Sequence, residues 1–553
     1  MTRTTLNGKP VHPAVISFAR AHRSGTLSRR EFLSHATALG MTATGAAALI
    51  GTRPARAEGH IQQGGTLRIQ MEVHASSEPR LYQWPEMGNQ TRGLLEYLVQ
   101  YNADGSFEPV LLDAWEVNED ATEYRLFLRQ GVTWNNGDPF TAADVAANIE
   151  GWCDTTVEGS SMPGRMGPLV DPSTGQLVEG ALQTPDDHTV ILTLPTPDIT
   201  LIAGLADYPS AIVHRDHIGE NHMTPDAIGT GAYRLESYVE GDKSVWVRNP
   251  DHTWWNAANG AHLDRIEFID VGTDPAAVVT AIEDDTVDMV YETVGEFVDI
   301  VTGLGFTESA AETAATIVIR GNANAEVEGI RPYSDVRVRN SIAMAIDNAI
   351  CLEIGYANRG TVAENHHVSP LHPAYAELPP LEGGRKGAVH LMESVGLGPF
   401  THELISLDDG WERDTADAAA AQLRDAGIRV ERRVVPGNEY WANWQTYPFS
   451  ATTWNHRPLA TQVLGLAYAS GGVWNETGFA DEEFDATLAE ANALADPDAR
   501  REKIRRLQEI LQEQAVIVQP FWRTIYNHRK EGIVGADIHP QFEIRYQYIG
   551  FDG

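Results

Sequence analysis

Three histidines lie close together in the segment E-N-H-H-V-S-P-L-H-P, and imidazole nitrogen is a common zinc ligand. His366, His367 and His372 are therefore the best candidates for a metal site. Adjacent histidines seldom direct both rings at one ion, however, and neither cysteine of the chain is near them. We expect a solvated or hydrogen-bonded loop and no metal. The chain also has no G-x-S-x-G, G-x-x-x-x-G-K or H-E-x-x-H motif. We therefore expect that the protein is not an enzyme and holds no cofactor. The alternative is a periplasmic hydrolase or metal-handling protein that uses the loop with His366, His367 and His372.

A second set of residues combines aromatic rings with a guanidinium group. The segment W-N-H-R, residues 454–457, follows an alternating stretch and is expected to leave the end of a strand, whereas Trp474 follows two glycines in a loop. An aromatic wall beside an arginine suits a small organic carboxylate, because the ring supplies contact area and the guanidinium supplies a bidentate partner. The alternative is that Trp454 belongs to the core and Arg457 to a surface ion pair.

Alternating and helical patterns indicate a mixed α/β chain that would hold these residues. Strands are expected over 65–71, 123–129 and 189–194, where every second residue is apolar. Helices are expected to begin at Thr141, with Asp144 completing a capping box, and at Asp496, with proline in the first turn. A further helix is expected from Ser334-Asp335, with Val338, Ile342, Ala345, Ile346 and Ala349 on one face. Pro379–Gly384 is the clearest linker-like stretch.

Composition excludes several classes of protein. The 553 residues include 41 Lys+Arg and 77 Asp+Glu, a net charge of −36, which argues against nucleic acid as a partner. Two cysteines, Cys153 and Cys351, are too few for a disulfide scaffold, and two buried free thiols are the expected state. No run of 18 apolar residues occurs, so a spanning helix is not expected.

The first 57 residues have the pattern of an export signal. Ser28–Leu33 reads S-R-R-E-F-L, a mildly apolar stretch follows, and Ala55-Arg56-Ala57 is a small-x-small cleavage pattern. The paired arginines indicate the twin-arginine route, with cleavage near Ala57 and a soluble periplasmic product. An amphipathic surface helix with a chance arginine pair is the alternative. Without residues 1–57 the chain would have 33 basic and 76 acidic residues, a net charge of −43, which keeps a protein soluble.

Several sequence blocks resemble the ABC-importer dipeptide/oligopeptide-binding proteins, which are solute-binding family 5. These blocks are Leu98–Glu150, Ile228–Leu235 with the following R-N-P and Trp254-Trp255, and Pro332–Arg339 through Asp347. The resemblance implies an α/β, two-lobed periplasmic-binding-protein fold, class II, of the large three-domain type, with a hinge and an interlobe ligand cleft. Lobe I would comprise 61–105, 200–322 and 515–553, the extra domain 106–199, and lobe II 323–514.

The resemblance also implies a mechanism and partners. The lobes would close over a short peptide or a related carboxylate-bearing small molecule and deliver it to ABC permease subunits driven by ATPase subunits, with the binding protein a monomer. Other solutes in the same family, such as an opine, an oligosaccharide or a metal complex, remain alternatives.

Ligand contacts are implied on both lobes. The loop His74–Glu78 would serve from lobe I and the W-N-H-R segment from lobe II. Peptide binders carry W-x-x-D there, and their aspartate holds the amino terminus of the peptide. Arg457 replaces that acid here, which favours an anionic or neutral polar group opposite it. The residues expected to contact the ligand are His74, Ser77, Glu78, Tyr291, Arg320, Asn322, Trp454, Asn455, His456, Arg457 and Trp474. For Arg320 a structural role near the hinge, and for Tyr291 plain core packing, are the alternatives.

Overall fold

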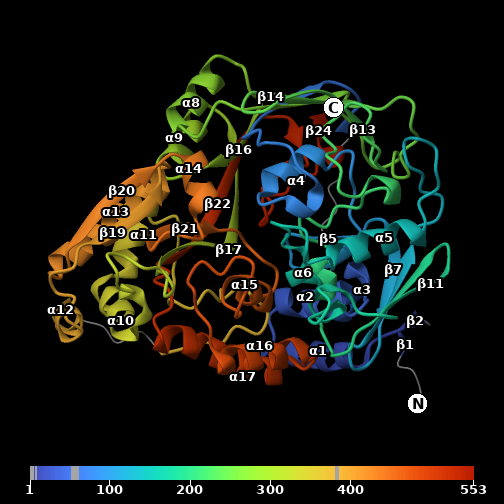
Figure 1. The fold of residues 1–553 in the computed structure, drawn as a ribbon. Coiled ribbons are helices and arrows are strands. Elements are labelled where there is room, and N and C mark those ends of the chain that lie inside the picture. The colour runs from blue at the N-terminus through green and yellow to red at the C-terminus, as the bar shows by residue number, and fades with distance from the viewer. Residues whose placement is uncertain (1–4, 7–8, 52–60, 380–384) are drawn as a thin grey trace.

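A computed structural model describes residues 5–6, 9–51, 61–379 and 385–553. An 11-stranded sheet runs through the molecule in the order β13-β14-β15-β4-β16-β22-β17-β21-β19-β20, and β18 pairs with β22 (Figure 1). The bounds are β13 Tyr233–Val239, β14 Lys243–Arg248, β15 Arg265–Ile269, β4 Thr66–Gln70, β16 Met289–Thr293, β22 Phe521–Arg529, β17 Thr307–Gly321, β21 Phe449–Trp454, β19 His402–Leu407, β20 Val430–Val435 and β18 Gly360–Val362.

We call the sheet portion from β13 to β16 lobe I, and the portion β21-β19-β20 with its helices lobe II. The long strands β17 and β22 lie between them and pair with each other in antiparallel register. The helices of lobe II are α10 Val336–Ala345, α11 Asn348–Tyr356, α12 Arg385–Ser394, α13 Gly410–Asp425, α14 Gly437–Asn443, α15 Ala460–Ala467, α16 Glu482–Ala493 and α17 Pro497–Glu513. Lobe I carries α4 Pro85–Thr91, α8 Pro275–Glu283 and α9 Phe297–Gly303. Each lobe has its own buried apolar core.

A separate four-stranded sheet is ordered β11-β12-β8-β7. Its strands are β7 Leu112–Val117, β8 Glu123–Leu128, β11 Leu182–Asp186 and β12 Thr189–Thr193, and α5 Ala142–Trp152 packs against it. The smaller elements are the hairpins β5 Val99–Tyr101 with β6 Phe107–Pro109 and β9 Val170–Asp171 with β10 Gln176–Leu177, the short helices α6 Met162–Met166 and α7 Leu201–Gly204, and the strands β3 Ile61–Gln62, β23 Ile533–Val534 and β24 Gly550–Asp552. All strands of this second sheet fall inside the predicted extra domain, whose exact boundaries stay a prediction.

Local sequence patterns account for most of these elements. The three expected strands are present as β4, β8 and β12, and their apolar faces are buried. The expected capping box is present at α5, where the backbone N–H of Thr141 donates to the carboxylate of Asp144 at 2.8 Å. Asp496 caps α17 by accepting from the backbone N–H of Ala499 at 2.8 Å. Cys153 and Cys351 are buried free thiols, as expected.

One expected helix is shorter than its apolar pattern suggested. The helix beginning after Asp335 ends at Ala345, because Ile346 is extended (φ −102°, ψ 123°). Asp347 then caps α11 by accepting from the backbone N–H of Ala349 at 3.0 Å. The prediction that Ile346 and Ala349 continue the face of the first helix was therefore wrong, since a side-chain cap within the pattern starts a second helix.

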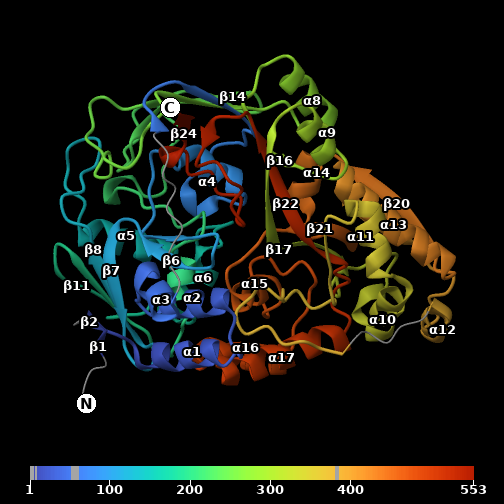
Figure 2. The same ribbon diagram turned by 180° about the vertical axis from the view of Figure 1, so that it is seen from behind.

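The N-terminal segment packs against the rest of the molecule as α1 Pro13–Arg23, α2 Arg29–Ala38 and α3 Ala43–Leu49, after a short hairpin of β1 Thr5–Leu6 and β2 Lys9–Pro10. Helix α1 lies beside α16 and α17 at the base of the molecule, and α2 and α3 lie above it (Figure 2). Arg30 donates to the Tyr101 hydroxyl at 2.7 Å, and Glu31 accepts from Arg501 of α17 at 2.8 Å. The expected cleavage position, Ala57, and most of the expected linker 379–384 lie outside the described residues. No helix in the described part of the chain is long and apolar enough to cross a membrane.

Candidate binding cleft between the lobes

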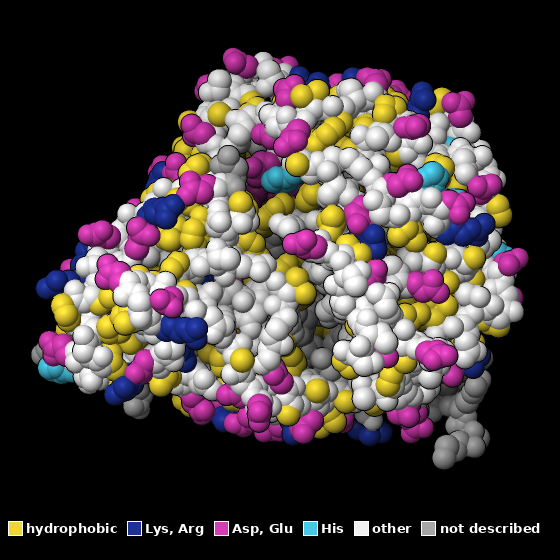
Figure 3. Space-filling model, in the orientation of Figure 1, with side chains coloured by type: hydrophobic (Ala, Val, Ile, Leu, Met, Phe, Trp, Pro, Cys, Tyr) yellow, Lys and Arg dark blue, Asp and Glu magenta, His cyan; other side chains and the backbone are white. Residues whose placement is uncertain are grey.

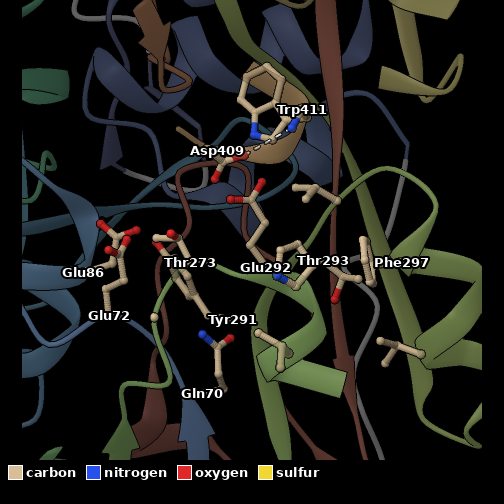
Figure 4. Close-up of a pocket in the computed structure, with 15 residues that line it drawn as sticks. Gln70, Glu72, Glu86, Thr273, Tyr291, Glu292, Thr293, Phe297, Asp409 and Trp411 are labelled. Carbon is tan, nitrogen blue, oxygen red and sulfur yellow. Dashed lines mark hydrogen bonds between the residues drawn. The ribbon is translucent and has the colours of Figure 1, made fainter. Parts of the chain in front are cut away.

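A cavity of about 110 Å³, measured as the space open to the centre of a water molecule, lies between lobe I and lobe II and is partly open to solvent. Gln70 and Glu72 from the end of β4, Glu86 from α4 and Tyr291 from β16 line one side, and Asp409 and Trp411 at the start of α13 line the other (Figure 4). Acidic side chains gather in a recess of the face shown in Figure 3, between the positions of α4 and α8 in Figure 1. The cavity is therefore formed by both lobes.

Strand direction explains why polar residues meet at this place. Strands β4 and β16 are parallel, so the chain leaves both at the same edge of the sheet. Glu72 follows β4, and Glu292 lies near the end of β16. In lobe II the chain leaves β19 just before Asp409, which caps α13 by accepting from the Trp411 backbone N–H at 3.3 Å. Ligand sites in α/β proteins commonly form where carboxyl ends of strands meet.

The carboxyl groups of Glu72, Glu86 and Asp409 in this cleft are harder to ionise than free carboxyl groups. Burial raises the pKa of Glu72 to about 7, and the negative charges of Glu86 and Asp409 contribute to that rise. Burial likewise raises the pKa of Glu86 to about 7 and that of Asp409 to about 6, with Glu292 adding repulsion at both. The cluster therefore takes up protons near neutral pH unless a positive charge enters the cavity.

Arg523 of β22 supplies a positive charge behind this cluster. Burial alone would lower its pKa, but the adjacent carboxylate of Glu292, with which it forms an ion pair, holds the pKa above its usual value. Its guanidinium lies 4.1 Å from the centroid of the Trp411 ring. Among the described residues that line the cavity itself, none is lysine or arginine.

Tyr291 is the one residue of the expected contact set that lines the cavity. The residue is 7% exposed, and its hydroxyl lies near Glu86 without a hydrogen bond of normal geometry. His74 is not among the lining residues, and its ring centroid lies 6.4 Å from that of Trp84. Ser77 donates only to the carbonyl of Glu78 at 3.4 Å. Glu78 is engaged by Arg80 at 2.7 Å.

Arg457 lies in a separate, buried cluster of charged and aromatic side chains. Its Nε is 3.5 Å from a carboxylate oxygen of Asp207, which Arg165 also contacts at 2.8 Å. The guanidinium lies 5.6 Å from the Tyr208 ring centroid and 5.7 Å from that of Trp474. The Nε of Arg457 has no hydrogen bond, and one terminal nitrogen of Arg165 has none. Two guanidinium groups thus share one carboxylate here.

Arg320 and the neighbouring predicted residues are held by partners within the protein. Arg320 is 1% exposed and donates to Glu476 at 2.9 Å and to the carbonyl of Tyr447 at 2.6 Å. Trp454 donates its indole N–H to the same Glu476 at 2.8 Å. Asn322 donates to the carbonyl of Gln445 at 3.2 Å. These contacts fit the structural alternative for Arg320, whereas a ligand contact for this set stays a prediction.

The remaining predicted positions differ in exposure. Asn455 is partly exposed, whereas His456 is buried and accepts from the backbone N–H of Ala314 at 2.9 Å. In the histidine loop, His366 contacts Glu364 at 2.9 Å. His367 bonds to the Tyr468 hydroxyl at 2.6 Å, and His372 bonds to the carbonyl of Arg457 at 3.1 Å. Within the described residues no group of His, Cys, Asp and Glu is placed to hold a metal ion.

Sequence reasoning missed most of the cavity. The missed residues include Gln70, Glu72, Glu86, Glu292, Asp409 and Trp411. Each of the four acids stands at or near the end of a strand or the start of a helix, which is a signal that the sequence contained. Two features of the cavity could not be predicted from the sequence. One is the pairing of β4 with β16, whose residues are some 220 positions apart, and the other is the approach of α13 from lobe II.

Comparison with known proteins identifies related chains of similar length. The model of bacterial extracellular solute-binding proteins, family 5 Middle, matches residues 106–475. The periplasmic oligopeptide-binding protein OppA of Haemophilus influenzae is 22% identical over 77% of this chain and 82% of its own. The structure of that species' OppA with the peptide RPPGFSPFR superimposes with a TM-score of 0.79 at 18% identity, covering 89% of this chain and 100% of the other. AgaA of Agrobacterium tumefaciens with agropinic acid gives a TM-score of 0.76 at 21% identity, covering 88% and 99%.

Proposed function

Because the chain belongs to the bacterial extracellular solute-binding proteins of family 5, we propose that it is the solute-binding component of an ABC importer. The family predicted from the sequence blocks is confirmed, and so is the two-lobed α/β fold. In this proposal the protein captures a short peptide or a related small molecule and delivers it unaltered to membrane permease subunits. AgaA, whose structure holds agropinic acid, supports a non-peptide solute such as an opine as the alternative.

The observation that carries this proposal is the cavity shared by the two lobes. Glu86 and Tyr291 reach it from lobe I, and Asp409 and Trp411 reach it from lobe II. A solute that touches both sides binds the closed arrangement better than an open one, and this difference in affinity shifts the population toward closure. Strands β17 and β22, which run between the lobes, are where we expect the hinge.

The test is whether solutes compact the protein without being consumed. We expect a true ligand, found by screening di- and tripeptides, opines, oligosaccharides and organic acids, to raise the unfolding temperature and to reduce the radius of gyration in solution scattering. Ligand present at 100 times its dissociation constant adds about 2.7 kcal/mol to stability. The ligand should be recovered chemically unchanged. Conversion of the compound, or binding without compaction at saturation, would contradict the proposal.

The Arg457 cluster is the second place where we propose ligand contact. Asp207 satisfies only part of the hydrogen-bonding capacity of Arg457 and Arg165, so a carboxylate of the solute could complete it. The partly exposed Asn455 borders this region from the end of β21. A zwitterionic solute would then have its carboxylate near Arg457 and its positive charge elsewhere.

Residues 1–57 are proposed to be a twin-arginine export signal. Arg29 is exposed at the start of α2, whereas Arg30 bonds to Tyr101, so recognition of both arginines requires this helix to leave its packing site. We expect replacing both arginines by lysine to leave the full-length precursor inside the cell, whereas the Arg23→Lys control is exported and shortened. Fractionation with mass measurement of the product checks this. Export of the double-lysine variant at the normal level would contradict the twin-arginine route.

A further inference from the structure

The cleft has an excess of negative charge that the protein does not balance. Glu72, Glu86, Glu292 and Asp409 line it, and none of the other described lining residues carries a positive charge. Arg523, behind the wall, forms an ion pair with Glu292. Glu72 and Glu86 project into the same part of the cavity from two different elements, and Asp409 comes from the opposite lobe (Figure 4). Such a grouping costs free energy in an unoccupied site, because like charges repel and burial removes water.

A second observation concerns a polar group in the wall of the cavity, the hydroxyl of Tyr291. The hydroxyl of Tyr291 lies in the wall of the cavity, with the residue 7% exposed, and it makes no hydrogen bond of normal geometry, although the carboxyl group of Glu86 lies near it. Buried hydroxyl groups in native proteins are nearly always bonded. A phenol oxygen can accept from an N–H donor, and the carboxylates around it can only accept when ionised. The Tyr291 hydroxyl can donate one proton to a carboxylate, but none of the described residues that line the cavity offers a positively charged donor to the rest.

The cavity walls also include aromatic side chains. Phe297 of α9 lines it, and so does Trp411 of α13, over whose ring the Arg523 guanidinium already lies at 4.1 Å from the centroid. The faces of aromatic rings attract cations, and the interaction strengthens when water is excluded. Ionised carboxylates, an unbonded hydroxyl and aromatic rings together form a surface that complements an organic ammonium or guanidinium group.

We propose that this cleft binds a positively charged amine or guanidinium group of the transported solute. The proposal rests on the solute-binding function and specifies the chemical class of the ligand. Glu72, Glu86 and Asp409 neutralise the charge, and Tyr291 accepts one of its N–H donors. Because Asp409 and Glu86 belong to different lobes, the cation is shared between them and stabilises their closed arrangement.

Binding of a cation should be coupled to release of protons. Glu72 and Glu86, each with a pKa of about 7, and Asp409, with a pKa of about 6, must ionise to pair with the ligand. Acidification therefore competes with the cation. The other charged groups that face this cluster act in two directions. His74, Arg413 and Arg523 favour ionised carboxylates, whereas Asp270, Glu292 and Glu412 disfavour them. Affinity should fall by about tenfold or more between pH 7.5 and pH 5.5, since a carboxyl of pKa about 7 is largely protonated at the lower value.

Calorimetric titration of the full chain with three probes tests the proposal. The probes are the tripeptide Lys-Ala-Ala, the same tripeptide acetylated on both amino groups, and agmatine, which is a non-peptide cation. We expect at least one of the two cationic probes to bind. If Lys-Ala-Ala binds, its acetylated form should bind at least about 100-fold more weakly, which corresponds to a loss of about 2.8 kcal/mol of binding free energy at 1.4 kcal/mol for each factor of ten. Binding of agmatine alone would also support the proposal and would identify a non-peptide solute.

Two isosteric variants locate the site. Glu86→Gln and Asp409→Asn should each weaken the cationic probe by about tenfold and reduce the pH dependence of its affinity. Glu403→Gln, an exposed carboxylate on β19 outside the cavity, is the matched control and should change neither. Unfolding temperatures confirm that each variant is folded. Equal binding of the acetylated peptide, unchanged affinity in both cleft variants, or no binding by either cation overturns the inference. Compaction by a neutral or anionic solute in the same protein would leave the importer function standing while the cation inference fails.

Discussion

Arg320→Met is expected to lower the free energy of unfolding by about 3–5 kcal/mol, which is the usual result of removing one partner of a buried ion pair. The guanidinium of Arg320 is 1% exposed and is bonded to Glu476 at 2.9 Å. Without it, the carboxylate of Glu476 remains buried with only neutral donors, among them the hydroxyl of Thr452 at 2.7 Å. Urea unfolding, with the slope compared between proteins, measures the loss.

A double variant separates the ion pair from simple loss of packing. Arg320→Met with Glu476→Gln should recover a large part of the stability, because an amide has no charge to leave unpaired. The exposed pair of Arg413 and Asp408, 3.1 Å apart, provides the control, and Arg413→Met should cost less than about 1 kcal/mol. If Arg320→Met instead keeps full stability and loses ligand binding, Arg320 is a ligand contact and its structural role is refuted.

Local chemistry made the elements of this fold predictable. The alternating residues of β8 and β12 and the caps at Thr141 and Asp496 each determine an element from neighbouring residues. The early end of α10 shows the limit of this reasoning, because an apolar periodicity continued through Asp347 while the backbone did not. Residues that can cap a helix therefore carry more information about boundaries than the apolar pattern around them.

The site was less predictable than the fold because its residues belong to distant parts of the chain. An arginine in place of the aspartate of W-x-x-D directed attention to the residues after β21, yet Arg457 is already close to Asp207. Nothing in the local sequence marks Asp207 as its neighbour, since the two positions are 250 residues apart. The acidic cleft, by contrast, draws on ordinary-looking carboxylates whose importance comes only from their convergence.

Substitution of Arg523 tests the role of charge in the acidic cleft, because this arginine forms an ion pair with Glu292 in the wall of the cavity. Arg523→Met should lower the free energy of unfolding of the ligand-free protein by about 3–5 kcal/mol at pH 8, because the buried guanidinium is the partner of Glu292. The loss should be smaller at pH 6. Without Arg523 the folded-state pKa values of Asp409 and Glu412 rise further above their unfolded values, so stability is retained at low pH and lost as pH rises through those values.

A neighbouring arginine on the same strand provides the matched control. Arg529 also lies on β22, but its carboxylate partner, Asp537, is exposed. Arg529→Met should therefore give a loss of stability that is the same at pH 6 and pH 8. An Arg523→Met loss that is equally independent of pH would show that the guanidinium acts through packing on Trp411 and not through charge.

The same variant distinguishes the two kinds of ligand group that the cleft could accept. Removing a buried positive charge beside the carboxylates increases their attraction for a cation, so Arg523→Met should bind agmatine about tenfold more tightly at pH 8 while being less stable without it. A solute whose carboxylate occupied this cleft would instead depend on Arg523 and would bind the variant more weakly. Calorimetric titration of both proteins at pH 8 decides between these outcomes. A variant that loses stability and gains affinity would show that the protein maintains an excess of negative charge here for the benefit of its ligand.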